Sequence, residues 1–305
     1  MAAKETTLRA GRRRVRLSNP DKQLFPADGI TKADLAAYFL AVAPAMASHM
    51  KERPLNLWRW NAGIERDVVI QQALPGGAPD WIRRVTVPRR RGGDVTHAVG
   101  GEPATLVWLA QVNCITPHVW ASRADRPDRP DRLVFDLDPP DEDPDAHFPA
   151  IRAGALALGD VLRELGLEPF AMTSGSRGLH VVAPLRRRAH ADVVRETAGA
   201  IAELVAARRP EELTTAWRKA KRGGRVLVDT ARNTYAQTTV APYAVRALPG
   251  APVATPLAWG ELEDPELHPR RFTLSGVPER LEQRGDPWEE IRTAARALPK
   301  GVRPL

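Results

Sequence analysis

Several residue types are scarce in this chain of 305 residues, and each scarcity excludes a class of protein. The single cysteine, Cys114, excludes an internal disulfide and a cysteine-rich zinc site, and its apolar neighbours predict a buried, inert thiol. No apolar run reaches the length of about 18 residues that a membrane span needs, and the first residues lack the apolar stretch of a signal peptide. We therefore expect a cytoplasmic protein that has no membrane partner.

The two signs of charge are unequal. Lys plus Arg number 45 against 37 for Asp plus Glu, which gives a formal net charge of +8 and a pI of about 10.1. This balance favours a polyanionic partner, and nucleic acid is the first candidate, although many arginine-rich proteins bind no polyanion. The basic residues form four runs, each either a solvated loop or a phosphate contact: GRRRVR at 11–16, PRRRGG at 88–93, PLRRRAH at 184–190 and WRKAKRGGR at 217–225. The glycine and proline flanks of the second run predict a mobile turn that would clamp a phosphate backbone.

Helical periodicity predicts three helices, over 31–50, 148–167 and 191–210. In the first, Thr31 is the expected N-cap and Asp34 stands at the third position of a capping box, while Pro44 ends or kinks the helix. The proline- and acid-rich stretch at 138–149 is expected to be one long loop rather than a domain boundary.

Apolar runs rich in β-branched residues predict four strands, over 132–138, 168–174, 179–185 and 225–230. Together with the last two helices they follow the order β-α-β-β-α-β, which is the pattern of ferredoxin-like and RNA-recognition-motif folds. The sequence therefore predicts an α/β (α+β) chain whose chemistry lies on one sheet.

Two carboxylates end the first of these strands. Asp136 and Asp138 are separated by one residue, so an extended strand places both on the same face. Such a pair is reasonable when a hard divalent cation such as Mg²⁺ or Mn²⁺ lies between the carboxylates. A strand that simply runs into an acidic loop is the alternative. A calcium loop fits poorly, because Asp141 stands where that loop requires glycine.

A third carboxylate, Asp229, ends the strand expected at 225–230. If that strand neighbours the one with Asp136 and Asp138, three carboxylates form a cage for two metal ions about 3.5–4 Å apart. Nucleotidyl transfer needs this arrangement: one ion lowers the pKa of the attacking 3′-hydroxyl and the other holds the triphosphate.

A glycine- and serine-rich turn, TSGSRGLH at 173–180, lies between two expected strands. Its backbone N–H groups and hydroxyls are expected to approach a triphosphate, and Arg177 and His180 to donate to the phosphate oxygens. An ordinary hairpin, with His180 as a core histidine, is the alternative. The co-occurrence with three carboxylates favours the functional interpretation.

Four motifs carry a resemblance to a known family: DLDPP at 136–140, SGSRGLHV at 174–181, VDTARN at 228–233 and TTVAPYAVRA at 238–247. Together they resemble the archaeo-eukaryotic primase superfamily, and specifically the polymerase domain of bacterial ligase D and its stand-alone relatives in non-homologous end joining. The resemblance runs from about residue 17 to about residue 247. It implies a primase-polymerase fold with an RNA-recognition-motif-like catalytic sheet and an N-terminal α/β lobe.

The resemblance also implies roles for individual residues. Two Mn²⁺ or Mg²⁺ ions would be bound by Asp136, Asp138 and Asp229. The incoming nucleotide would be contacted by His118, Ser174, Arg177, His180, Arg232 and Arg246. Lys22 and Lys32 would capture the 5′-phosphate of the downstream strand, which is notable because only 7 of the 45 basic residues are lysines. Other DNA contacts are expected from Arg53, Arg59 and Arg222.

The sequence departs from the family pattern in places. The family commonly has two phenylalanines and a lysine where this chain has VIQQ at 69–72, so base stacking on the template is in doubt there. Trp58 and Trp60 are possible substitutes, with core packing expected for at least one of them. Gln237 stands where relatives often carry lysine, and Thr230-Ala231 replace an aromatic-serine pair.

The expected organisation is a single primase-polymerase catalytic domain over 1–305, with an N-terminal lobe at 1–110, a catalytic lobe at 111–250 and an extension at 251–305. The length leaves no room for a ligase or nuclease domain, so we expect a stand-alone enzyme associated with the nucleoid.

The expected function is a template-directed nucleotidyltransferase that adds NTPs or dNTPs to a DNA 3′ end during gap filling, with possible primase activity. Its partners would be gapped or broken DNA with a 5′-phosphate, the protein Ku and a separate ATP-dependent DNA ligase. Two alternatives stay open. VFDLD resembles the signature of haloacid-dehalogenase phosphatases, although Pro139-Pro140 replace the usual glycine that follows. A catalytically silent module that binds DNA ends is the other.

Overall fold

The computed structural model describes residues 4–302, which fold into two compact units. The first unit runs to Asp125 and takes in Thr238–Ala254 and Phe272–Gly285. The second comprises Arg126–Gln237, Thr255–Arg271 and the chain from Asp286 onward. These divisions differ from the expected lobes at 1–110, 111–250 and 251–305, because the chain crosses between the units several times.

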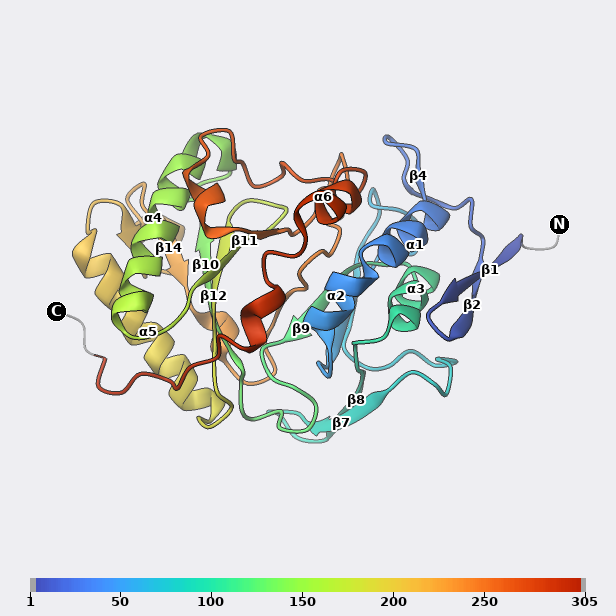
Figure 1. The fold of residues 1–305 in the computed structure, drawn as a ribbon, viewed down its shortest axis with the longest axis horizontal. Helices are drawn as coiled ribbons and strands as arrows, with labels where there is room; N and C mark the ends of the chain where they lie inside the picture. The colour runs from blue at the N-terminus through green and yellow to red at the C-terminus, as the bar shows by residue number, and fades with distance from the viewer. Residues whose placement is uncertain (1–3, 303–305) are drawn as a thin grey trace. The chain divides into compact units, whose positions relative to one another are not determined.

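The second unit is built on a six-stranded sheet with the order β13-β14-β10-β12-β11-β16. Figure 1 labels four of these strands, β14, β10, β12 and β11. Its strands are β10 (Arg132–Asp138), β11 (Phe170–Thr173), β12 (Leu179–Pro184), β13 (Leu213–Thr214), β14 (Val226–Asp229) and β16 (Pro256–Leu257). All neighbours are antiparallel except β13 and β14. The four expected strands are confirmed, and their spatial order β14-β10-β12-β11 is that of the β-α-β-β-α-β fold predicted from the sequence.

Two helices, α4 (Pro144–Glu164) and α5 (Ala191–Arg208), pack against this sheet and against each other. Helix α4 begins four residues earlier than predicted, and the loop expected over 138–149 is therefore shorter than expected. The side chain of Asp143 accepts a hydrogen bond from the N–H of Ala146 at 3.1 Å, and Pro144 occupies the first turn. This N-cap followed by proline is a helix-start signal that the acidic composition of the stretch obscured.

The first unit contains a four-stranded sheet with the order β15-β9-β5-β6 and three two-stranded hairpins. The sheet strands are β5 (Leu55–Arg59), β6 (Val69–Gln71), β9 (Cys114–Trp120) and β15 (Thr238–Val240). The hairpins are β1 (Glu5–Ala10) with β2 (Arg13–Ser18), β3 (Gln23–Phe25) with β4 (Ile30–Thr31), and β7 (Arg84–Pro88) with β8 (Asp94–Ala98). The basic run at 88–93 forms the exposed turn between β7 and β8.

The helices of the first unit are α1 (Lys32–Ala41), α2 (Ala43–Met50), α3 (Pro103–Gln111) and α6 (Val277–Arg284). Helix α1 begins with the predicted capping box, in which Thr31 and Asp34 exchange side chain to backbone hydrogen bonds of 3.2 and 2.8 Å. Pro44 lies in the first turn of α2, so the segment expected as one helix over 31–50 is divided in two. A proline is tolerated there because the first N–H groups of a helix have no intrahelical partner.

Two parts of the C-terminal chain, Thr255–Arg271 and the residues from Asp286 onward, contribute to the second unit. Strand β16 pairs with β11 at the edge of the sheet, and Trp288 is fully buried. The indole Nε1–H of Trp288 donates to the carbonyl of Ala171 at 3.0 Å. Strand β16 and Trp288 therefore pack on the sheet.

Two expectations about burial and membranes can be compared with the structure. Cys114 is fully buried, and burial raises the pKa of its thiol, as the prediction of an inert cysteine requires. Within residues 4–302, no helix has both the length and the apolar character that crossing a bilayer demands.

Candidate functional site: a three-carboxylate cluster on the sheet of the second unit

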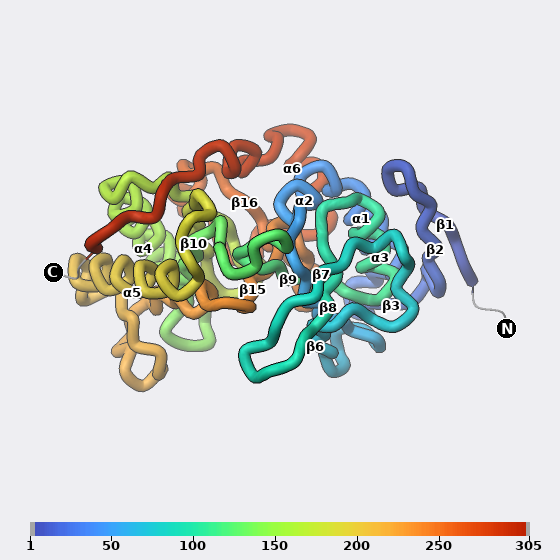
Figure 2. The backbone as a smooth tube through the Cα atoms, turned by 90° about the horizontal axis from the view of Figure 1, so that it is seen from below, coloured from blue at the N-terminus to red at the C-terminus, as the bar shows by residue number. Residues whose placement is uncertain are grey.

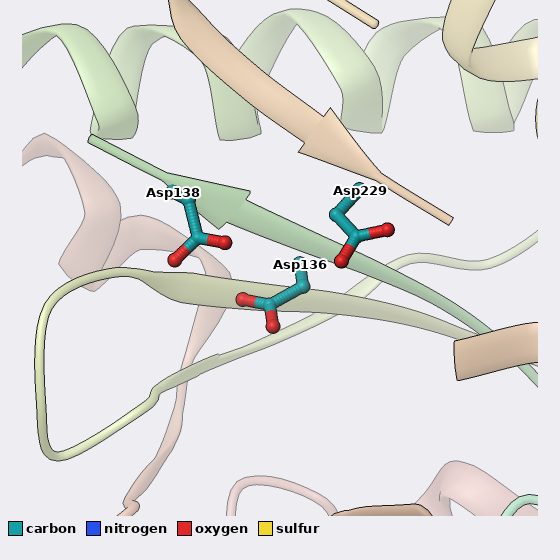
Figure 3. Close-up of side chains that lie close together, drawn as sticks. All are labelled: Asp136, Asp138 and Asp229. Atoms are coloured by element: carbon teal, nitrogen blue, oxygen red, sulfur yellow. The ribbon is translucent and has the colours of Figure 1, made fainter. Parts of the chain in front are cut away.

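Three aspartates meet on two neighbouring strands of the second unit. Asp136 and Asp138 lie on β10, where the alternation of side chains places them on one face. Asp229 ends β14 and stands directly opposite Asp136 in the antiparallel register. One carboxylate oxygen from each aspartate lies within 4.8 Å of one oxygen from each of the other two, and Figure 3 shows the three side chains close together.

The cluster is electrostatically unfavourable on its own. Burial, followed by the negative charge of Asp136, raises the pKa of Asp138 to about 6. Burial also raises the pKa of Asp229. Both shifts show that the surroundings disfavour three negative charges at this point. Bound divalent cations offset such repulsion, and the carboxylate donors present are those that Mg²⁺ and Mn²⁺ prefer. The residues therefore fit a metal site.

A buried asparagine that sequence analysis did not assign fixes the end of β14. The Asn233 side chain accepts from the N–H of Val134 at 2.8 Å and donates to its carbonyl at 2.7 Å. Its amide also donates to the carbonyl of Thr230 at 2.8 Å, and Asp229 accepts from the N–H of Ala231 at 2.7 Å. The side chain of Asn233 thus continues the strand pairing beside β10 after β14 has ended. No periodicity in a single sequence distinguishes such an asparagine from a loop residue.

The glycine- and serine-rich turn between β11 and β12 is held by one hydroxyl. The Oγ of Ser174 accepts from the N–H groups of Ser176, Arg177 and Gly178 at 3.1–3.2 Å. These N–H groups were expected to face a triphosphate, and the structure instead directs them to Ser174. Gly178 is required by contact with β10, because a Cβ at this position would lie 1.9 Å from the carbonyl oxygen of Leu137.

His180 joins this turn to the carboxylates. It lies on β12 opposite Asp136 in the register, and its Nε2 is 3.4 Å from Asp136 Oδ1. Its side chain is buried, as the alternative of a core histidine also required. The ring nevertheless reaches the carboxylate cluster, so burial and a place in the site are both present.

Glu142 links two basic side chains beside the carboxylate cluster. Arg177 Nη1 lies 2.9 Å from Glu142 Oε2, and the Lys219 ammonium pairs with the other oxygen of the same carboxylate. The three side chains are between 40% and 73% exposed, so these pairs contribute little to stability. Their effect is to place two cations close to the loop that follows Asp138.

The remaining expected contacts of the second unit differ in exposure. Arg222 is buried, and its guanidinium donates to the carbonyls of Pro139 and Trp217 at 3.0 and 3.2 Å. It thereby fastens the basic run at 217–225 to the loop after β10. Arg232 lies on the short 3-10 helix Ala231–Asn233, directly after the strand that carries Asp229. For both residues a phosphate contact stays a prediction.

In the first unit, three expected DNA-binding residues form a basic group that we call the lysine pocket: Lys22, Lys32 and Arg59. Lys32 is buried, and burial, followed by the charges of Lys22 and Arg59, lowers its pKa to about 8. The Lys22 ammonium donates to the carbonyl of Asn61, and Arg59 Nε donates to that of Val112 at 2.7 Å. A binding anion relieves such a like-charge group, which is the behaviour expected of a phosphate site.

The other predicted contacts of the first unit are positioned by different partners. Arg53 is buried and donates to the carbonyls of His49 and Trp120 at 3.1 and 3.0 Å. His118 on β9 stacks on Trp58, with ring centroids 4.3 Å apart. The backbone N–H of Arg246 donates to a carbonyl in the same unit at 2.7 Å. Contacts of these residues with DNA or nucleotide stay predictions.

The structure also shows the burial of residues at which the sequence differs from the family pattern. Trp60 is buried, which confirms core packing for one of the two tryptophans. At the expected place of the phenylalanine pair, Val69 and Ile70 are 44% and 54% exposed on the edge strand β6. An apolar surface is therefore retained there although the aromatic rings are not.

A largely antiparallel sheet of this order that carries three neighbouring carboxylates is typical of proteins that perform metal-dependent chemistry at acidic residues. The comparison with known families is more specific. Residues 31–288 match the family described as LigD, primase-polymerase domain. The chain belongs to this family, as the four motifs predicted, and the match does not favour the phosphatase alternative.

Known relatives agree with this assignment. The multifunctional non-homologous end joining DNA repair protein LigD of Mycobacterium tuberculosis is 34% identical over 290 residues, which cover 92% of this chain and 37% of that protein. The bifunctional non-homologous end joining protein LigD of Bacillus subtilis is 27% identical over 278 residues, 90% of this chain and 44% of that protein. The chain thus spans less than half the length of these relatives.

A solved structure is similar over almost its whole length. The polymerase domain from Mycobacterium tuberculosis ligase D, determined in complex with DNA, superposes with a TM-score of 0.84 at 32% sequence identity. The similarity covers 92% of this chain and 99% of that domain. The primase-polymerase fold expected from the motifs is confirmed.

Proposed function

We propose that this protein is a template-directed nucleotidyltransferase that adds NTPs or dNTPs to a DNA 3′ end during gap filling in bacterial non-homologous end joining. The observation that carries the proposal is the meeting of Asp136, Asp138 and Asp229 on the sheet of a chain that belongs to the LigD primase-polymerase family. In the reaction, the 3′ oxygen forms a bond to the α-phosphorus of the nucleotide. The bond between the α- and β-phosphates breaks, and pyrophosphate leaves.

The three carboxylates would hold two divalent ions, Mn²⁺ or Mg²⁺. Ions bound there supply charge stabilisation for the transferring phosphoryl group and lower the pKa of the attacking hydroxyl. The chain's own contribution is orientation. Strand pairing fixes Asp136 opposite Asp229, so the oxygen donors are in place before substrate arrives and little reorganisation is needed.

Cationic and hydrogen-bonding groups near the carboxylates would position the triphosphate. Ser174 Oγ accepts hydrogen bonds from three backbone N–H groups and so fixes the conformation of the turn, and a contact of Ser174 with a phosphate oxygen is proposed from the family resemblance. His180 and Arg177 would add two further donors, and Arg232 a third from the segment after β14. His118 and Arg246 complete the proposed nucleotide contacts.

The lysine pocket would bind the 5′-phosphate at the downstream side of a gap. Lys22 and Lys32 supply the charge, and an anion bound there would offset the burial and like charge that lower the pKa of Lys32. Arg53, Arg59 and Arg222 are proposed as further DNA contacts. We also propose Ku and a separate ATP-dependent ligase as partners, with the protein acting at the nucleoid.

Single-nucleotide incorporation on a gapped duplex tests the proposal. Wild-type protein should add the nucleotide complementary to the template, with NTP and dNTP compared in Mn²⁺ and in Mg²⁺. Asp136→Ala and Asp229→Ala should abolish incorporation while DNA binding persists, because they remove metal donors and leave the lysine pocket intact. Asp145→Ala, an exposed acidic residue in the first turn of α4, is the matched control.

The same experiment has outcomes that would refute the assignment. Incorporation by both aspartate variants at the wild-type rate would show that the carboxylates do not carry the reaction. Binding to gapped DNA without incorporation by the wild type, in either metal, would indicate a silent end-binding module.

A further inference from the structure

The arginine-rich run at 11–16 belongs to the β1–β2 hairpin of the first unit, and the proposed site does not use it. In this hairpin Leu8 stands opposite Val15 and Arg9 opposite Arg14. Val15 and Leu17 are buried, and helix α3 packs against both strands. Because side chains alternate along a strand, Arg9 and Arg14 lie on the opposite, solvent face.

Arg16 shares that face with Arg14, and Arg12 lies in the turn. We call the four exposed residues Arg9, Arg12, Arg14 and Arg16 the arginine ribbon. It follows the dark blue hairpin near the N-terminus in Figure 2.

Folding alone does not favour the arginine ribbon. Like charges directly opposite each other in an antiparallel pair are destabilising, and a two-stranded hairpin has little stability to spare. Of the acidic residues nearby, Glu5 pairs with one member of the ribbon, Arg16, and Glu102 pairs with Arg13. Within residues 4–302, no carboxylate lies within ion-pair distance of Arg9, Arg12 or Arg14. A ligand with several negative charges would balance them.

The hairpin is attached to the elements that form the lysine pocket. The N–H of Ser18, the last residue of β2, donates to the side chain of Gln111 at 2.8 Å. Gln111 ends α3, and the next residue, Val112, accepts the 2.7 Å hydrogen bond from Arg59 of the pocket. Lys22 follows Ser18 by four residues in the chain. The ribbon and the pocket are therefore parts of one continuous basic segment.

We propose that the arginine ribbon binds the phosphate backbone of the duplex downstream of a DNA gap, beyond the 5′-phosphate assigned to the lysine pocket. This rests on the proposed function, in which gapped DNA is the substrate. Arginine suits the task because its guanidinium donates several hydrogen bonds to phosphate oxygens without reading the base sequence. Each phosphate contact releases counterions, so the ribbon makes binding more dependent on salt.

The test compares gapped DNA with two lengths of 5′-phosphorylated downstream duplex, about 6 and about 18 base pairs, each closed by a hairpin loop. Fluorescence anisotropy gives the affinity over a series of salt concentrations. For wild-type protein the slope of log affinity against log salt should be steeper on the long arm, by about 0.9 per additional phosphate contact. The variant Arg9→Gln/Arg12→Gln/Arg14→Gln should lose this increment, a fall of about 2–3 in slope, and behave as wild type on the short arm.

Two further variants isolate the cause. Arg9→Lys/Arg12→Lys/Arg14→Lys keeps the charges and should keep most of the increment. Arg163→Gln/Arg195→Gln/Arg208→Gln removes the same net charge from α4 and α5 of the second unit and should leave the slopes unchanged. The proposal is overturned if the ribbon glutamine variant has wild-type slopes on both arms, or if the α4 and α5 variant loses as much as the ribbon variant.

The unfolding temperature and the incorporation rate separate effects on folding and catalysis from effects on DNA binding. The ribbon glutamine variant should unfold at or above the wild-type temperature, because a like-charged pair is removed; a fall of several degrees would assign the arginines to folding and overturn the proposal. Incorporation on the short arm is expected at the wild-type rate in this variant. Failure of wild-type protein to incorporate would refute the polymerase proposal, while the salt slopes would still decide the role of the ribbon.

Discussion

The carboxylate cluster of the second unit and the lysine pocket of the first are electrostatic opposites. In the cluster, burial and neighbouring negative charge raise the pKa of Asp138 to about 6. In the pocket, burial and neighbouring positive charge lower the pKa of Lys32 to about 8. Both sites hold like charges close together at a cost in folding free energy, and ligands of opposite sign remove that cost. At each site, neighbouring like charge adds to the effect of burial on the pKa.

The two sites differ in how the chain fixes them. Strand register places the carboxylates, so the short side chains of Asp136 and Asp229 have little freedom. The lysine pocket depends on long side chains from a turn and from the start of α1, joined by a backbone hydrogen bond from the Lys32 N–H to the Lys22 carbonyl at 2.8 Å. We therefore expect small changes in the cluster to affect the reaction more strongly than comparable changes in the pocket affect binding.

The largest effect is expected from Asp229→Asn. Asparagine keeps an oxygen for the Ala231 N–H but weakens metal binding, so incorporation should fall by about 10³-fold, roughly 4 kcal/mol. The unfolding temperature in metal-free buffer should rise, because a repulsive charge is removed. Primer extension and calorimetry measure the two effects, with Asp160→Asn on α4 as the control. A variant that was inactive but also less stable would contradict the account of a strained cluster.

Asn233→Asp should produce the next largest effect. The new side chain cannot donate to the carbonyls of Val134 and Thr230, and it adds a fourth negative charge to the region, so the rate constant for incorporation should fall by about 100-fold. The preference for 5′-phosphorylated DNA should not change, since the lysine pocket is untouched. Single-turnover incorporation and DNA binding, measured on the same preparation, distinguish the two sites. Equal losses in both would point to general unfolding instead.

Lys22→Ala/Lys32→Ala tests the lysine pocket, and we expect it to impair DNA binding and spare catalysis. Loss of two charge-assisted contacts should reduce the affinity ratio of 5′-phosphate over 5′-hydroxyl gaps by about 30-fold. Incorporation at saturating DNA should stay near the wild-type rate. Electrophoretic mobility shifts with both DNA ends give the ratio, and Lys51→Ala/Lys300→Ala provides a charge-matched control. An unchanged ratio in the double variant would remove the pocket from the proposed function.

The smallest effect is the pH dependence of the same ratio. Phosphate binding requires protonated Lys32, so the preference should fall about tenfold between about pH 7 and about pH 9, as the free pocket loses its proton near pH 8. Lys32→Arg, which stays charged, should abolish this dependence.

The stability of the free protein should instead increase as the pH rises. The folded-state pKa of Lys32 lies below the ordinary 10.5, so the folding cost is complete below pH 8 and is relieved as pH rises between these values. Binding titrations and thermal unfolding across this range check both directions.

Much of the second unit could be predicted from the sequence. The strand at 132–138 was predicted with its observed ends, because an apolar run with two carboxylates at its close has few other conformations. The start of α4 was predicted four residues late, since an N-cap aspartate is hard to distinguish within an acidic stretch. Gly178 and Asn233 were not recognised as structural residues. Each contacts β10, which lies about 40 positions from Gly178 and about 100 from Asn233 in the chain.

The amino-acid sequence by itself determined which chemical groups are present and on which local elements several of them lie: aspartates at strand ends, a helix capped by Thr31, and an arginine-rich run at 11–16. These features follow from periodicity and capping, which act over a few residues. Only the tertiary structure decided that Asp229 faces Asp136, that Asn233 continues the pairing of β14, and that Lys32 is buried beside other cations. Burial and strand register depend on contacts between residues far apart in the chain, and those contacts also set the pKa shifts of Asp138 and Lys32.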